Sequence, residues 1–145
     1  MKQLICLFCS FVLSLSLCSC KKDYTHAIYN INIFTECIYN QSVGNEWEET
    51  FKMDDKNISN NEQIILPLDV TATKTIVITI REKDKYSDVS SKEITINLKN
   101  AETKTTFLTI RENNGRYKGN EAKWKVTISV ELIKKIERDD YLKIE

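Results

Sequence analysis

The side chains with ligand-binding chemistry gather in two polar stretches, 82–91 and 112–121, each set between two apolar segments. Carboxylate and amide oxygens are the ligands that calcium takes, about six to eight at a time, and a tyrosine ring can contact a sugar or a peptide. The candidate binding residues are Glu82, Asp84, Tyr86 and Asp88 in the first stretch and Glu112, Asn114, Arg116 and Tyr117 in the second. If the fold brings the two stretches together, they form one candidate binding site.

The spacing Glu82-x-Asp84-x3-Asp88 resembles the calcium loops of the phospholipid-binding sandwiches first defined in protein kinase C. The resemblance implies a calcium site made by these carboxylates. It covers one loop, because 112–121 contains no aspartate. The competing interpretation is that these are solvated loop charges, and we expect neither bound calcium nor any other cofactor. We also expect Asp84 and Asp88, as carboxylates at a loop tip, to contribute little to the stability of the core.

Enzymatic chemistry has little support, and we expect a protein that is not an enzyme. His26 is the single histidine, and Cys37 falls in the apolar phase of an expected strand, so a histidine-rich metal site and a Cys–His dyad are both disfavoured. Adjacent carboxylates such as Asp54 and Asp55 point to opposite faces of an extended chain. The sequence has no glycine-rich phosphate loop and no nucleophile elbow.

Cys20 is the remaining residue whose position in the sequence predicts a chemical modification. It follows one early charge, Lys2, and an apolar run from Leu4 to Leu17, and the small residue Ser19 precedes it directly. This order of a positive start, a hydrophobic stretch and a small-residue cleavage site is typical of a signal peptide. The apolar run is shorter than the roughly 20 residues that a membrane-spanning helix needs.

The segment Leu17-Cys18-Ser19-Cys20 resembles the processing site of bacterial diacyl or triacyl lipoproteins, and this resemblance covers residues 1–23 only. It implies cleavage before Cys20 and attachment of lipid (fatty acids such as palmitate) to the Cys20 thiol. Cleavage before Cys18 is disfavoured because it would place the bulky Leu17 at the cleavage position. The alternative is an ordinary secretory signal with a coincidental cysteine.

The residues after Cys20 refine the expected location. Lys21-Lys22-Asp23 partly resembles the signal that exports lipoproteins of some Gram-negative bacteria to the outer leaflet. We therefore expect a cell-envelope protein anchored in the Gram-negative outer membrane and displayed at its surface. The expected organisation is a signal peptide at 1–19, the lipidated cysteine and a short tether at 20–23, and one folded domain at 24–145.

Charge and cysteine content exclude several classes of protein. The 21 basic and 21 acidic side chains balance, so a nucleic-acid-binding protein and a polybasic membrane surface are both disfavoured. Of five cysteines, three lie in the expected signal peptide and Cys20 carries the lipid, which leaves Cys37 alone. An intrachain disulfide is then impossible, and Cys37 is expected to be a small core residue whose thiol reacts only after denaturation.

Three glycines, one proline and many Thr, Ile and Val residues favour strands over helices. Apolar residues alternate with polar ones in most of the segments between turns, which is the pattern of half-buried strands. The expected strands are 29–39, 47–53, 64–68, 75–80, 94–98, 106–110 and 124–132, with a weak further segment at 58–61. The sequence therefore predicts an antiparallel β-sandwich of seven to eight strands, immunoglobulin-like or a similar Greek key. Both tryptophans fall in the apolar phase, and the tail 133–145 fits either a short helix or a trailing strand.

One sequence echo accompanies these strands. Thr79-Ile80-Arg81-Glu82 recurs about 30 residues later as Thr109-Ile110-Arg111-Glu112, and a polar loop with a tyrosine follows each copy. Two copies are too few for a solenoid, so we interpret them as two strand–loop–strand units of similar construction.

If neighbouring strands alternate in direction, loops 82–91 and 112–121 lie at the same end of the domain. Loop 40–45 joins them if the weak segment near Ile58 is a strand, and the N-terminus then starts at the opposite end. The predicted function is a lipid-anchored binding or structural module of the cell envelope, held at the membrane by its lipid, with a protein or glycan partner at the loop end. The alternatives are a calcium- or glycan-binding surface lipoprotein using the two loops and, second, a small hydrolase.

Overall fold

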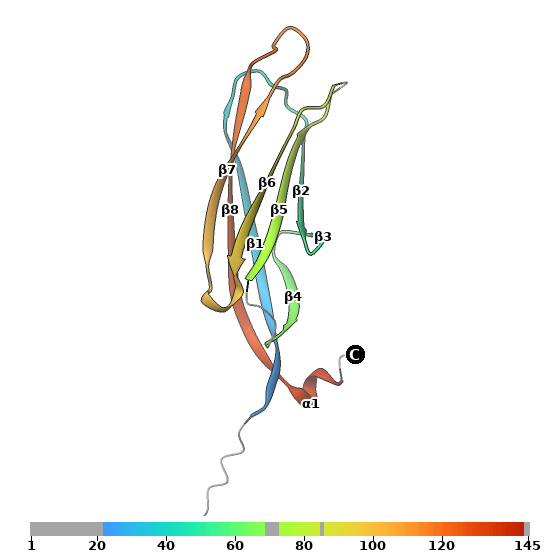
Figure 1. The fold of residues 1–145 in the computed structure, drawn as a ribbon, viewed down its shortest axis with the longest axis vertical. Helices are drawn as coiled ribbons and strands as arrows, with labels where there is room; N and C mark the ends of the chain where they lie inside the picture. The colour runs from blue at the N-terminus through green and yellow to red at the C-terminus, as the bar shows by residue number, and fades with distance from the viewer. Residues whose placement is uncertain (1–21, 69–72, 85, 144–145) are drawn as a thin grey trace, which may run out of the picture.

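The computed structural model describes residues 22–68, 73–84 and 86–143, and within them the chain forms two antiparallel four-stranded sheets packed face to face (Figure 1). Sheet A has the strand order β4-β1-β8-β7, and sheet B has the order β3-β2-β5-β6. The strands are β1 (Tyr24–Asn40), β2 (Trp47–Met53), β3 (Lys56–Ile58), β4 (Glu62–Pro67), β5 (Thr73–Glu82), β6 (Val89–Asn97), β7 (Thr103–Arg111) and β8 (Glu121–Glu137). A 3₁₀ turn, η1 (Leu98–Asn100), follows β6, and a short helix, α1 (Arg138–Tyr141), follows β8.

The predicted antiparallel β-sandwich is confirmed. The order of strands within the sheets is not the ABED and CFG order of immunoglobulin domains, because β1 lies between β4 and β8 and does not pair with β2. The weak segment near Ile58 is the short strand β3, and the strand ending at Pro67 lies at the edge of sheet A. Proline is tolerated there because an edge strand does not need every backbone N–H for pairing.

The core lies between the two sheets and is built by the alternation seen in the sequence. Ile76, Ile78 and Ile80 on β5 are 0% exposed, and Val126 and Ile128 on β8 face them from the other sheet at 0%. Burial of one such side chain stabilises the fold by about 2 kcal/mol. Among the described residues, the buried apolar side chains lie between positions 27 and 136, so residues 21–145 contain them and are expected to fold without the N-terminal segment.

Both tryptophans face the core, as predicted, Trp124 within it and Trp47 partly buried against it. Trp124 is 6% exposed, and Trp47 packs against the core in an edge-to-face contact with it, at 5.3 Å between ring centroids. Neither ring is available as a flat surface for a sugar. Leu132, expected to continue the inward phase of β8, is instead 41% exposed, because the β1–β8 pairing has a register shift beside it.

The prediction that Cys37 is buried is wrong. Its side chain is exposed, and its thiol donates a hydrogen bond to the carbonyl oxygen of Tyr39 at 3.4 Å. Strand β4 pairs with β1 only as far as Ile31, so the later part of β1 forms an edge of sheet A. The pairing of β1 with β8 also shifts register between Cys37 and Tyr39. The odd-numbered residues after Ile33 are therefore no longer buried, although they continue the inward phase of the strand.

Because Cys37 is exposed, a bulky maleimide is expected to label residues 21–145 with one equivalent in native buffer within minutes. Denaturant should not increase the final amount, because this segment has no other cysteine. Mass spectrometry of the intact protein measures the labelling, and Cys37→Ser is the control that should not react. Protection of the thiol until denaturant is added would contradict the exposed position.

The tail, which fitted either a helix or a strand, contains both. Strand β8 continues to Glu137, and α1 then turns back against the start of β1. The ring of Tyr141 stacks on the ring of His26 at 3.5 Å between centroids, and Arg138 pairs with Asp23. Cys20 and the expected signal peptide at 1–19 lie outside the described residues. In the part of the chain that the structure describes, no helix has the length and hydropathy needed to span a membrane.

Candidate functional site at the loop end

Three connections meet at one end of the sandwich: 41–46 between β1 and β2, 83–88 between β5 and β6, and 112–120 between β7 and β8. In Figure 1 they are the loops at the top, whereas the start of β1 and α1 lie toward the bottom. The predicted meeting of loops 82–91 and 112–121 at one end is therefore confirmed. Loop 41–46 joins them, as expected once β3 is a strand. We call this region the loop end.

Hydrogen bonds hold the three loops against one another. The backbone N–H of Lys83 donates to the carbonyl of Glu46 at 2.7 Å, which joins the first loop to the second. The side-chain amide of Asn113 donates to the carboxylate of Asp88 at 2.6 Å, which joins the second loop to the third. Within the first loop, Asn40 accepts from the N–H of Val43 and donates to the carbonyl of Gly44. The loop end is thus a connected structure.

An open hollow of about 460 Å³ lies among these loops, and we call it the loop hollow. It is lined by Ser42, Val43, Gly44, Asn45, Glu82, Asp84, Glu112 and Tyr117. Four of these, Glu82, Asp84, Glu112 and Tyr117, were candidate binding residues from the sequence. The neutral residues 42–45 were missed, because nothing in the sequence of that turn indicates ligand binding.

Glu82 and Glu112 are not solvated loop charges. They are only 3% and 8% exposed, respectively. Both continue the inward phase of their strands, since Glu82 follows Ile78 and Ile80 in steps of two and Glu112 follows Ile110 in the same way. The repeated Thr-Ile-Arg-Glu segment therefore places one glutamate from each sheet at the same end of the core. The sequence contains this signal, because the inward alternation extends two residues beyond the last isoleucine of each strand.

The Glu82 carboxyl lies in an unusual environment. Its Oε2 atom is buried and has no hydrogen-bond partner, and Gly44 approaches so closely that a Cβ there would lie 2.3 Å from Oε1. Gly44 also has a φ of +106°, so glycine is required on both counts. Burial, followed by the charge and hydrogen bonding of Asp84 and the charges of Glu112 and Asp88, raises the pKa of Glu82 from 4.5 to about 7.

The expectation that Asp84 and Asp88 are both loop-tip carboxylates is wrong for Asp88. Asp88 is 3% exposed and accepts hydrogen bonds from the backbone and side-chain amides of Asn113, so it joins two loops structurally. Asp84 is exposed and accepts a hydrogen bond from the backbone N–H of Tyr86, which shapes a turn. Substitution of Asp88 is therefore expected to destabilise the loop end.

The remaining candidates lie on the outside of the loop end. Tyr86 is 56% exposed and Tyr117 is 49% exposed. The guanidinium of Arg116 lies 5.8 Å from the centroid of the Tyr117 ring, and the backbone N–H of Asn114 donates to Glu112 Oε1 at 3.3 Å. Both rings therefore present apolar area at the surface of the loop end.

Among the described residues, no group of three or more His, Cys, Asp or Glu side chains is arranged to hold a metal ion. The carboxylates of Glu82, Asp84 and Asp88 share one loop, but Asp88 points to Asn113 and Glu82 lies beneath Gly44. This arrangement does not provide the convergent oxygens that calcium coordination requires.

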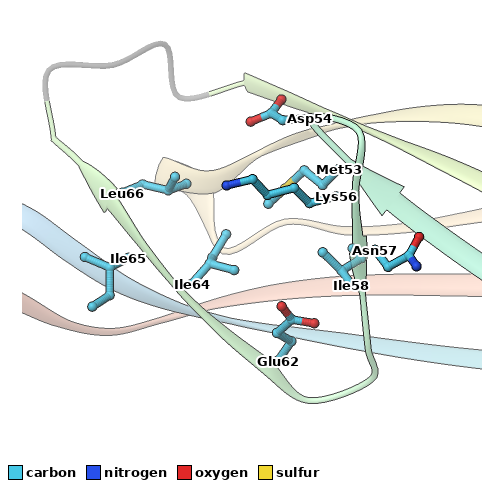
Figure 2. A pocket seen from close by; sticks show the side chains of 9 residues that line it. All are labelled: Met53, Asp54, Lys56, Asn57, Ile58, Glu62, Ile64, Ile65 and Leu66. Atoms are coloured by element: carbon cyan, nitrogen blue, oxygen red, sulfur yellow. The ribbon is translucent and has the colours of Figure 1, made fainter.

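A second hollow, of about 290 Å³, opens on the side of the sandwich between β3 and β4 (Figure 2). Figure 2 shows Ile64 of β4 and Ile58 of β3 pointing toward one another across it, with Lys56 extending from β3 toward β4. Two of the three charged side chains that line it have partners, because Asp54 pairs with Lys74 and Glu62 accepts from the N–H of Ser59. This hollow therefore has less to offer a polar ligand than the loop hollow.

No protein-family model and no curated protein sequence matches the chain. Among solved structures, a C2 domain of plant extended synaptotagmin 1 is similar at 12% sequence identity and a TM-score of 0.33. The match covers 79% of this chain and 99% of that domain. A similarity this distant does not bear on function.

Proposed function

We propose that this chain is a lipid-anchored binding module of the bacterial cell envelope, attached through Cys20 and presenting its loop end to a partner. The observation that carries the proposal is that the loop hollow lies among the connecting loops. These loops are at the end of the sandwich opposite the start of β1 (Figure 1). A chain tethered just before Tyr24 would hold this hollow at the far side of the domain from the membrane. A rigid sandwich with its long loops at one end is a common arrangement for binding.

The length of the strands determines the distance between the start of β1 and the loop end. Strands β1 and β8 each have 17 residues and run between the two ends of the domain. At a rise of about 3.3 Å per residue, they place the loop end roughly 50 Å from the start of β1. A partner in the envelope or at the cell surface would therefore meet the loops first. Attachment to a membrane, location in the outer membrane and the absence of enzymatic activity all belong to the proposal.

The test is photo-crosslinking in intact bacteria. A photoreactive amino acid replaces Tyr86 at the loop end or, as a matched control, the exposed Lys99 at the opposite end. We expect discrete adducts of one mass from position 86 and none of that mass from position 99. Equal adducts from both positions, or none from position 86, would contradict a binding role for the loop end.

A glycan is the second candidate partner. It is favoured by two exposed rings at the loop end, Tyr86 and Tyr117, which could contact the faces of a sugar; Tyr117 also lines the loop hollow. Analysis of the crosslinked adducts by glycosidase treatment separates a glycan partner from a protein.

A further inference from the structure

We infer that the loop hollow binds a cationic nitrogen group of the partner, a guanidinium or an ammonium, through the carboxylates of Glu82, Asp84 and Glu112. This inference rests on the proposed function in one respect, because it also takes the loop end as the end of the domain that binds. It assigns the chemistry of the ligand, which neither the anchor nor the fold does.

The first observation is one oxygen of the Glu82 carboxyl, Oε2, which has no hydrogen-bond partner. The residue is only 3% exposed, lines the hollow, and leaves Oε2 without a hydrogen-bond donor. A buried acceptor without a partner destabilises a fold, so such groups are rare in folded proteins unless a ligand or a function accounts for them. An incoming N–H donor would supply the missing hydrogen bond.

The second observation is the charge of the lining. Asp84 and Glu112 stand beside Glu82, and Asp88 is close enough to act on its charge. Among the described residues that line the hollow, none is basic. Neutralisation of this negative charge by a cation would relieve the mutual repulsion of the carboxylates, which favours a cationic ligand over a neutral one.

The third observation is the tyrosine in the wall. The ring of Tyr117 lines the hollow, and a guanidinium, that of Arg116, already lies near it. Aromatic faces attract planar cations through their quadrupole. The hollow therefore combines carboxylates with an aromatic ring, a combination that fits guanidinium and alkylammonium groups. A metal ion would need several oxygens converging on one point, and the described residues do not provide that.

The inference is tested by NMR titration of ¹⁵N-labelled residues 21–145 at pH 8 and constant ionic strength. The probes are Nα-acetyl-arginine methylamide and Nα-acetyl-lysine methylamide, with the neutral Nα-acetyl-glutamine methylamide and calcium chloride as comparisons. We expect the arginine or the lysine probe to produce saturable shifts at the amides of 42–45, 82–84 and 112–117. The glutamine probe and calcium should produce none, and the titration shows which of the two cationic groups is preferred.

Variants locate the binding. Glu82→Gln keeps the shape of the side chain but removes the charge, and should weaken binding by about tenfold or more, a loss of about 1.4 kcal/mol. Asp84→Asn, an exposed change that leaves the fold intact, should weaken it by a smaller factor. The matched control is Glu131→Gln, an exposed glutamate on β8 outside the loop hollow, which should bind as the unaltered protein does.

The outcomes separate this inference from the proposed function. Shifts from calcium alone, equal shifts from the neutral probe, or no shift from either cationic probe would overturn the inference. If position 86 still crosslinks to a partner in those cases, the proposed function stands without it. If the cationic probes bind but position 86 captures nothing, the hollow is a cation site and the proposed partner role fails.

Discussion

Replacing Cys20 with serine is expected to move the protein completely from the detergent phase to the aqueous phase of a detergent partition. Two acyl chains are needed for stable anchoring, and the described part of the chain contains no helix able to span a membrane. The Cys20→Ser chain should also take up no labelled fatty acid. The measurement is metabolic labelling with an alkyne fatty acid, followed by partition and immunoblotting, so that acylation and attachment are read on the same sample.

The neighbouring cysteine provides the matched control. Cys18→Ser changes the same side chain two residues earlier and should leave labelling and partition unchanged, because the proposed cleavage is directly before Cys20. Loss of labelling in Cys18→Ser, with labelling retained in Cys20→Ser, would place the processing site at Cys18. Absence of labelling in the unaltered protein would remove the lipid anchor from the proposed function.

Much of the fold could be predicted because it rests on local alternation. Ile76, Ile78 and Ile80 point inward because each is two residues from the next, and a strand turns over once per residue. The same reasoning placed both tryptophans in the core correctly. The two polar loops could also be assigned to one end, because antiparallel strands reverse direction at every connection.

Cys37 shows where this reasoning fails. The alternation of apolar and polar residues predicts which face of the sheet a side chain points to. It does not predict whether that face is covered by the other sheet. Burial at the end of β1 depends on how far sheet B extends over that face, on where the edge strand β4 stops and on where the β1–β8 register shifts, and all three are set by tertiary structure. Leu132 fails for the same reason, beside another register shift.

The loop hollow was predictable only in part. Glu82 and Glu112 could have been found, because the inward phase of β5 and β7 reaches them, and a buried glutamate is a strong indication of function. Gly44 could not, because its importance depends on the close approach of loop 41–46 to Glu82. Such a contact between distant segments leaves no periodic pattern in the sequence.

Glu82 is expected to make the domain less stable as the pH rises from 5 to 8.5. Its folded-state pKa is about 7, above the ordinary value of 4.5, so the folded protein keeps a proton that the unfolded chain loses. The stability contributed by this proton is complete below pH 4.5 and is lost as the pH passes through 7. The titratable or charged groups around Glu82 are Asp84, Asp88, Glu112 and Tyr117, and none of these contributes a positive charge that would offset the loss.

The size of the effect can be measured with one substitution. A pKa near 7 instead of 4.5 corresponds to roughly 2 to 3 kcal/mol between pH 5 and pH 8.5. Urea unfolding of residues 21–145 at both pH values should show a loss of that size beyond the loss in Glu82→Gln, which cannot ionise. Glu131→Gln, exposed on β8, should keep the full pH dependence.

If Glu82→Gln and the unaltered protein lose stability equally, the Glu82 carboxyl is already ionised at pH 5 and its burial costs nothing. A saturating cationic probe should reduce the loss at pH 8.5 if it binds the ionised carboxylate, which connects the pH dependence to the chemistry of the loop hollow.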